Sequence, residues 1–226
     1  MKRTKAAVAV AIVGALAFVG GTAWSNGPWR LQSDEVRYNI PPTADGGVNP
    51  DPFLANGVTT GWKVPVYSAA GTGPAGRNTL APSGTPARYI DYDVLAQAYP
   101  GFAPTDADKA AGVLPAGVTI TEAQGLNTLA RVQENLVSAG LTLRDITFMR
   151  IYVDNPAGAT IADYAGWNRS YRKFVANVDL TTGETIDAYE PVVFSNKTRP
   201  ARTNIEVATL PVAGWLIEIE VVAAVT

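Results

Sequence analysis

The segment Arg199-Pro200-Ala201-Arg202 carries two guanidinium groups just before a predicted strand. Proline fixes the local backbone, so a guanidinium at this position can be aimed out of the sheet edge. Its planar fork of donors matches a carboxylate at two points. The same pattern also fits a surface arginine that pairs with a nearby acid. The segment therefore indicates a carboxylate-binding arginine and leaves a structural role open.

Two acids alternate with apolar residues near the C-terminus, in Ile217-Glu218-Ile219-Glu220-Val221. Alternate residues of a strand share a face, so Glu218 and Glu220 lie together, opposite the isoleucines. Paired carboxylates can serve as general acid and base. They also fit a solvated face or a polar subunit interface. Asn168, on a predicted helix, is a third polar candidate, for a binding site or for a buried backbone cap.

The chain of 226 residues contains no histidine and no cysteine. Catalysis by Ser-His-Asp or Cys-His groups is therefore excluded, as are zinc and copper sites built on imidazole or thiolate. Carboxylate, arginine, lysine, tyrosine and backbone chemistry remain.

The N-terminus has the features of an export signal. Lys2, Arg3 and Lys5 precede an uncharged stretch that ends near Ala23-Trp24-Ser25, a pattern typical of a cleaved signal peptide. We expect residues 1–25 to be a signal peptide, or an uncleaved membrane anchor, and the mature chain to be secreted or periplasmic. The formal charge of −2 becomes −5 without the three bases, which argues against a nucleic-acid partner.

Turn formers dominate the chain before its regular part. Residues 26–51 predict a loose N-terminal arm, and a strand is expected near residues 64–68. Residues 74–118 are rich in proline and glycine, with one helix-like piece around residues 89–98. They indicate an insertion in a single domain spanning residues 52–226.

The regular part predicts helices and strands in alternation. Thr121 and Gln124 form a capping-box pattern for a helix that Gly140 ends. A strand over residues 146–153, a helix over 162–175, and strands over 203–210 and 215–225 follow, with a hairpin turn between the last two. The order predicts an α+β domain with two helices on one face of a mixed or antiparallel sheet.

The C-terminal half strongly resembles the RidA/YjgF family. Residues 199–223, RPARTNIEVATLPVAGWLIEIEVVA, reproduce its Pro-Ala-Arg-Ser/Thr and Ile-Glu-Ile-Glu-x-x-Ala signature. The blocks EAQGLNTLARVQENLVSAGLTLRDITFMRIYVDN and YAGWNRSYRKF are similar to its first helix with the following strand and to its second helix. This resemblance implies a chorismate-mutase-like fold and a homotrimer with sites between subunits.

The resemblance also implies roles for single residues. Arg202 matches the arginine that binds the substrate carboxylate, and Glu218 matches the acid associated with the attacking water. Asn168 matches a pocket asparagine, and Ser68 a serine before Gly-Gln, although Ala69-Ala70 follow here. Two positions depart from the family: Phe53 stands in place of a pocket tyrosine, and Asn204 in place of a frequent pocket cysteine.

The function implied is hydrolytic deamination of 2-imino and 2-enamino acids to 2-keto acids and ammonia, without a cofactor. A binding protein for a small carboxylate or an aromatic ligand, on the same trimeric scaffold, is the main alternative, favoured by Phe53 and by the insertion at 74–118. An extracellular structural or interaction protein is a third reading. The partners expected are the small carboxylate and two further copies of the chain, with membrane contact only through an uncleaved N-terminus.

Overall fold

The computed structural model describes residues 31–226. The predicted signal peptide at residues 1–25 lies outside these residues, so its export role stays a prediction. Within the described part of the chain, no helix is both long enough and apolar enough to cross a membrane.

A four-stranded sheet in the order β3-β6-β4-β5 forms the centre of the molecule. Its strands are β3 (Val66–Ser68), β4 (Ile146–Val153), β5 (Ala201–Glu206) and β6 (Ile217–Ala224). β4 pairs with β5 in parallel and with β6 antiparallel, while β3 pairs antiparallel with β6. The sheet is therefore mixed, as the sequence predicts.

The predicted hairpin between the last two strands is wrong. β5 and β6 lie on opposite sides of β4, and residues 207–216 connect them past the end of that strand. β4 is an interior strand of the sheet, and its side chains Met149, Ile151 and Val153 are fully buried. The backbone groups of such a strand need a hydrogen-bonded neighbour on each edge, and β5 and β6 supply them. Closeness in sequence favoured the hairpin, but β4 separates the two strands.

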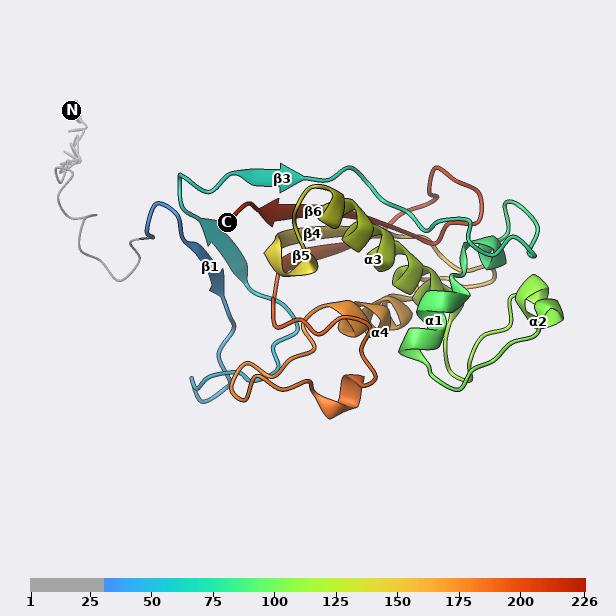
Figure 1. Cartoon of the computed structure of the whole chain (residues 1–226), viewed down its shortest axis with the longest axis horizontal. Coiled ribbons are helices and arrows are strands. Elements are labelled where there is room, and N and C mark those ends of the chain that lie inside the picture. The colour runs from blue at the N-terminus through green and yellow to red at the C-terminus, as the bar shows by residue number, and fades with distance from the viewer. Residues whose placement is uncertain (1–30) are drawn as a thin grey trace, which may run out of the picture.

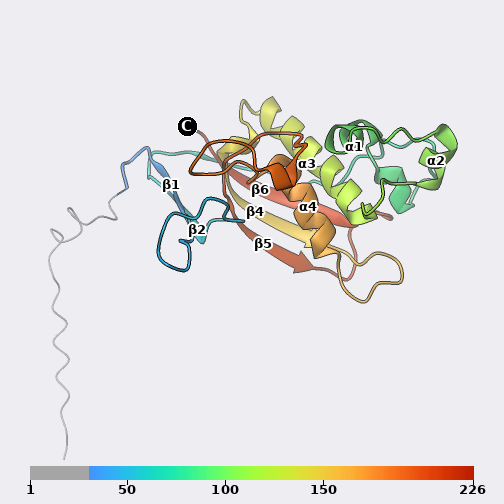
Figure 2. The same cartoon turned by 90° about the horizontal axis from the view of Figure 1, so that it is seen from below.

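Two helices cover one face of this sheet, α3 (Ile120–Ser138) and α4 (Tyr164–Phe174) (Figure 2). Leu126, Leu129 and Trp167 are fully buried beneath them in the core. The predicted cap at Thr121 is wrong: the Thr119 side chain accepts from the Glu122 backbone, and Thr121 lies buried inside the helix. The two predicted helices are otherwise confirmed, each with a shift of about two residues at its start.

A small second sheet precedes the main one. It pairs β1 (Val36–Asn39) with β2 (Gly57–Thr60), and Tyr38 Oη donates to the Ile146 carbonyl at 3.0 Å. β1 falls within the stretch of residues 26–51 for which the sequence predicted only an arm. Turn formers around a short strand hide its pattern.

The insertion at residues 74–118 is folded and lies at the end of the molecule away from β1 (Figure 1). It contains the 3₁₀ turn η1 (Pro86–Tyr89) and the helices α1 (Tyr92–Ala98) and α2 (Asp106–Ala111). Asn127 on α3 fastens it by donating to the carbonyls of Ala75 and Tyr89. Two further 3₁₀ turns are η2 (Leu143–Asp145) and η3 (Asp187–Tyr189).

Candidate functional site

Arg202 is the second residue of β5 and projects onto the face that carries the helices. Its register partner on β4 is Met149, a fully buried residue of that face. The expectation that it leaves the sheet at its edge is therefore corrected, because the strand begins at Ala201. Arg202 Nη2 donates to Asn168 Oδ1 on α4 at 2.8 Å. The arginine and the asparagine chosen from sequence do meet.

The guanidinium of Arg202 rests against aromatic rings and keeps free donors. Its central carbon lies 4.2 Å from the Phe53 ring centroid and 4.5 Å from that of Tyr171. Nε and Nη1 are buried without a hydrogen-bond partner among residues 31–226. Burial lowers the pKa of Arg202 to about 10, so the group remains charged at neutral pH. A buried cation with unsatisfied donors is costly unless a ligand supplies the acceptor.

The other residues around Arg202 complete what we call the arginine half-site: Arg202, Asn168, Phe53 and Asn204. Asn204 lies two residues further along β5 on the same face, and its Oδ1 accepts from Trp167 Nε1 at 3.1 Å. Phe53 stacks on Tyr171 with ring centroids 5.3 Å apart. Its ring therefore takes part in the aromatic wall, in a place where a tyrosine would add a hydroxyl.

Arg199, the neighbouring candidate, has a structural role. Only 1% of its side chain is exposed, and it donates to the carbonyls of Pro52, Lys197 and Val178 at 2.6, 2.8 and 2.7 Å. These bonds tie the start of β5 to two loops. The fixed position of Arg199 helps to set the direction of β5 and hence the place of Arg202.

Glu218 lies on the opposite face of the sheet. Its register partner on β4 is Tyr152, while the flanking Ile217 and Ile219 are fully buried towards the helices. Glu220 shares its face and is held by Arg150 at 2.7 Å, whereas Glu218 has no ion pair among residues 31–226. Burial, together with the charge of Glu220, raises the pKa of Glu218. The group is suited to accept or hold a proton.

Gly71 lies directly against the Glu218 carboxylate, and a methyl group at this glycine would overlap it. We call Glu218, Glu220 and Gly71 the glutamate half-site. Ser68 shares its face of the sheet but stands further along, paired with Val222 on β6. The structure therefore does not place Ser68 against Glu218.

The two half-sites are separated within one chain. β5, with Arg202, is one edge of the sheet, and β6, with Glu218, is separated from it by β4. The two side chains also point to opposite faces. One copy of the chain therefore cannot bring Arg202 and Glu218 to one substrate.

A cavity of about 400 Å³ opens beside the arginine half-site. Phe53 and Asn168 form part of its wall, and cations and tyrosines that the sequence analysis did not single out form most of the rest: Tyr99, Arg169, Arg172, Lys173 and Tyr189. The basic residues occur at positions i, i+3 and i+4 of α4. That spacing, on the helix that carries Asn168, was a signal that could have found them.

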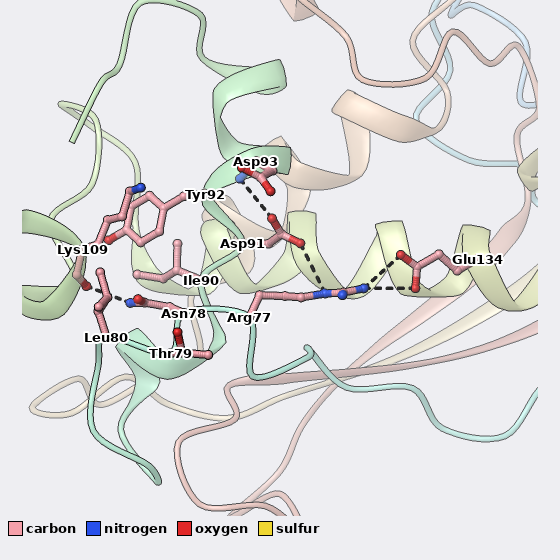
Figure 3. Close-up of a pocket in the computed structure, with 10 residues that line it drawn as sticks. All are labelled: Arg77, Asn78, Thr79, Leu80, Ile90, Asp91, Tyr92, Asp93, Lys109 and Glu134. Atoms are coloured by element: carbon pink, nitrogen blue, oxygen red, sulfur yellow. Dashed lines mark hydrogen bonds and ion pairs between the residues drawn. The ribbon is translucent and has the colours of Figure 1, made fainter. Parts of the chain in front are cut away.

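A second cavity of about 460 Å³ lies between the insertion and α3, and Arg77 and its two acidic partners line part of it (Figure 3). Arg77 bridges Asp91 at 3.7 Å and Glu134 at 3.1 Å. Asn78 donates to the carbonyls of Ala87 and Lys109. These contacts fasten the insertion to α3. Among residues 31–226, no cluster of acidic side chains has the arrangement of a metal site.

Residues 101–225 match the model of a protein family described as Endoribonuclease L-PSP, the YjgF/Rid family. The chain belongs to this family. The match covers more than half of the chain, including both helices and three strands of the sheet. The family resemblance seen in the sequence is thereby confirmed, and so is the α+β fold class.

Solved structures of YjgF/Rid proteins are similar to this chain. The Rid family protein YyfB of Yersinia pestis is 21% identical, with a TM-score of 0.43, over 84% of this chain and 98% of that one. The YjgF gene product of E. coli is 22% identical, with a TM-score of 0.37, over 83% and 94%. A YjgF family member from Neisseria meningitidis is 16% identical, with a TM-score of 0.37, over 86% and 98%. A search of curated proteins finds no significant match.

Proposed function

We propose that the protein hydrolyses reactive 2-imino and 2-enamino acids to 2-keto acids and ammonia, at a site shared by two subunits of a homotrimer. The observation that carries this proposal is the state of Arg202. Its guanidinium is fixed by Asn168 and keeps buried donors without a partner among residues 31–226. A carboxylate is the natural partner for such a fork.

The second subunit follows from the separation of the half-sites. Glu218 and Arg202 lie on opposite faces and on different strands of one sheet. In a closed ring, each subunit presents its arginine half-site to one neighbour and its glutamate half-site to the other. Each interface then holds one complete site.

Arg202 holds the substrate carboxylate, and Glu218 of the adjoining copy holds a water molecule against the C=N carbon. The substrate reacts as the imine protonated on nitrogen. Water adds to its C=N carbon as Glu218 takes a proton from the water, which gives a neutral carbinolamine. Glu218 then returns that proton to the amino nitrogen, the C–N bond breaks, and the hydroxyl proton passes through Glu218 to the departing ammonia, so that a 2-keto acid and ammonium remain. The water supplies the keto oxygen, so the reaction balances without an oxidant or a cofactor.

Binding without turnover is the second candidate function. Phe53, which lies 4.2 Å from Arg202, lacks the hydroxyl that a tyrosine would offer to a ligand. Endonucleolytic cleavage, named in the family description, gains little support from this chain. Its formal charge is −2, and removal of residues 1–25 would make it more acidic.

The direct test couples an amino-acid oxidase to trapping of the imine by semicarbazide, with and without the chain from residue 26. We expect the protein to suppress semicarbazone formation while keto acid and ammonia still accumulate. Unchanged trapping would contradict the enzymatic proposal. In this proposal the mature chain acts outside the cytoplasm. Determining the N-terminal residue of the protein in the exported fraction tests that part.

A further inference from the structure

The proposed function gives no role to the cavity beside the arginine half-site. It is contiguous with that half-site, because Asn168 accepts from Arg202 and also lines the cavity. Phe53 likewise touches the Arg202 guanidinium and forms part of the cavity wall. A ligand held at Arg202 would thus extend its side chain into this space.

Parts of the wall come from the insertion at residues 74–118 and from the loop that carries η3. Tyr99 is the C-cap residue of α1 in the insertion, and Tyr189 is the last residue of η3. Tyr189 Oη donates to Asp51 at 2.6 Å, and Tyr99 Oη donates to the buried Glu122. The two tyrosines are therefore held in place, and the cavity is a built feature of this chain.

The cavity and its surroundings have a surplus of positive charge. No acidic side chain lines the cavity. In the contacts around it, two carboxylates, Asp51 and Glu122, face five cations: Arg169, Arg172, Lys173, Arg199 and Arg202. The net charge of these seven groups is therefore +3: Arg172 and Arg199 share Asp51, Arg169 pairs with Glu122, and no ion pair holds Lys173 or Arg202 among residues 31–226.

Two of these cations have donors or surface to offer a ligand. Arg169 contacts Glu122 through Nε at 2.7 Å, and 45% of its side chain is exposed, so a ligand in the cavity can reach it. Lys173 Nζ donates only to the carbonyls of Tyr189 and Pro191 at 3.0 Å within the described part of the chain. An anion at this end would meet unbalanced charge in a partly dry cavity, where electrostatic attraction is strong.

We propose that this cavity selects substrates with a second acidic group, so that the preferred substrate is a 2-imino dicarboxylic acid and the product a 2-oxo dicarboxylic acid. The inference rests on the proposed function, because Arg202 must hold the carboxylate next to the C=N carbon. The distal carboxylate then lies near Arg169 and Lys173. Phe53 and Tyr189 flank the carbon chain between the two acids.

The test compares the affinities of three product-like acids by calorimetry on the intact protein: 2-oxoglutarate, 2-oxopentanoate and phenylpyruvate. 2-Oxoglutarate should bind about tenfold more tightly than 2-oxopentanoate, the worth of one charge-assisted hydrogen bond. Arg169→Gln, which can still bond Glu122, should bring that ratio close to one. Arg77→Gln is the matched control, since Arg77 is also half-exposed and paired with acids but lies on the insertion, and it should keep the ratio.

Equal affinities of wild type for 2-oxoglutarate and 2-oxopentanoate would overturn this inference and leave the proposed function standing. Tighter binding of phenylpyruvate than of 2-oxoglutarate would also overturn it, in favour of an aromatic side chain. If Arg169→Gln keeps the affinity ratio between 2-oxoglutarate and 2-oxopentanoate, the inference is also overturned. If none of the three acids binds, both the proposed function and this inference fall.

Discussion

Arg202 and Glu218 lie on opposite faces of one sheet, with β4 between their strands. Arg202 is in register with Met149 and Glu218 with Tyr152, and these two β4 positions are three residues apart and point to opposite faces. In the proposed mechanism, Arg202 and Glu218 therefore act together across a subunit interface, and the mechanism depends on the assembly of subunits.

Arg202→Lys should weaken binding of 2-keto acids such as 2-oxobutyrate by at least about tenfold, because an ammonium keeps the charge but loses the two-point grip. The fold should persist, since Arg202 bonds one side chain, Asn168, among residues 31–226. Calorimetry on the variant and wild type measures the change, with circular dichroism as the check on folding. Unchanged affinity would remove Arg202 as the carboxylate ligand.

Glu218→Gln should abolish hydrolysis while keeping, or tightening, the binding of a 2-keto acid. The amide keeps the size and the hydrogen bonds of the side chain but loses the basic oxygen. Turnover and keto-acid affinity measured on one preparation separate a catalyst from a binding protein. Retained turnover with a lowered melting temperature would assign Glu218 a structural role instead.

The acid limb of activity should lie above the ordinary glutamate pKa of 4.5, because burial and the Glu220 charge raise the pKa of Glu218. As the pH falls, Glu218 therefore protonates earlier than a free glutamate and hydrolysis is lost earlier. Glu220→Gln removes the repelling charge, so the limb should move to lower pH. Profiles of kcat/KM against pH measure the shift, with the exposed Glu134→Gln as control. A limb that moves upward would contradict the assignment.

Arg199→Met should lower the free energy of unfolding by about 2–4 kcal/mol, because the carbonyls of Pro52, Lys197 and Val178 would lose a charged donor in a buried place. Urea denaturation measures the loss. Arg144→Met, at an exposed arginine bonded to the Ser195 carbonyl, is the matched control and should change stability little. An equal effect of both substitutions would rule out the structural role of Arg199.

The sequence predicted the elements whose patterns are local. The strand over residues 146–153 was confirmed at both ends, because six of its eight residues are β-branched or aromatic. The partners of each strand were less predictable. β5 and β6 are close in sequence, but each of them pairs with β4 and not with the other. This pairing depends on the buried position of β4 in the sheet, which local sequence patterns do not reveal.

The candidate site was predicted in part. Arg202 and Asn168 could be chosen from the family signature, and the structure brings them to 2.8 Å. The residue type alone could not show that Arg199 is structural, because its burial depends on contacts with the loops at Pro52 and Val178. The cavity was missed altogether: Tyr99 and Tyr189 are distant in sequence, and only tertiary packing brings them to α4.

The most direct test of the shared site mixes two variants that are each impaired in one half-site. Arg202→Lys keeps a wild-type glutamate half-site, and Glu218→Gln keeps a wild-type arginine half-site, so an interface between the two variants can restore one complete site. Unfolding and refolding them together in equal amounts should recover about a quarter of the wild-type rate, because random assembly pairs the two intact half-sites at that fraction of interfaces. Each variant refolded alone should show much less activity than the mixture. If the mixture shows no more activity than the separate variants, while co-purification through an affinity tag on one variant confirms mixed oligomers, the shared site is contradicted.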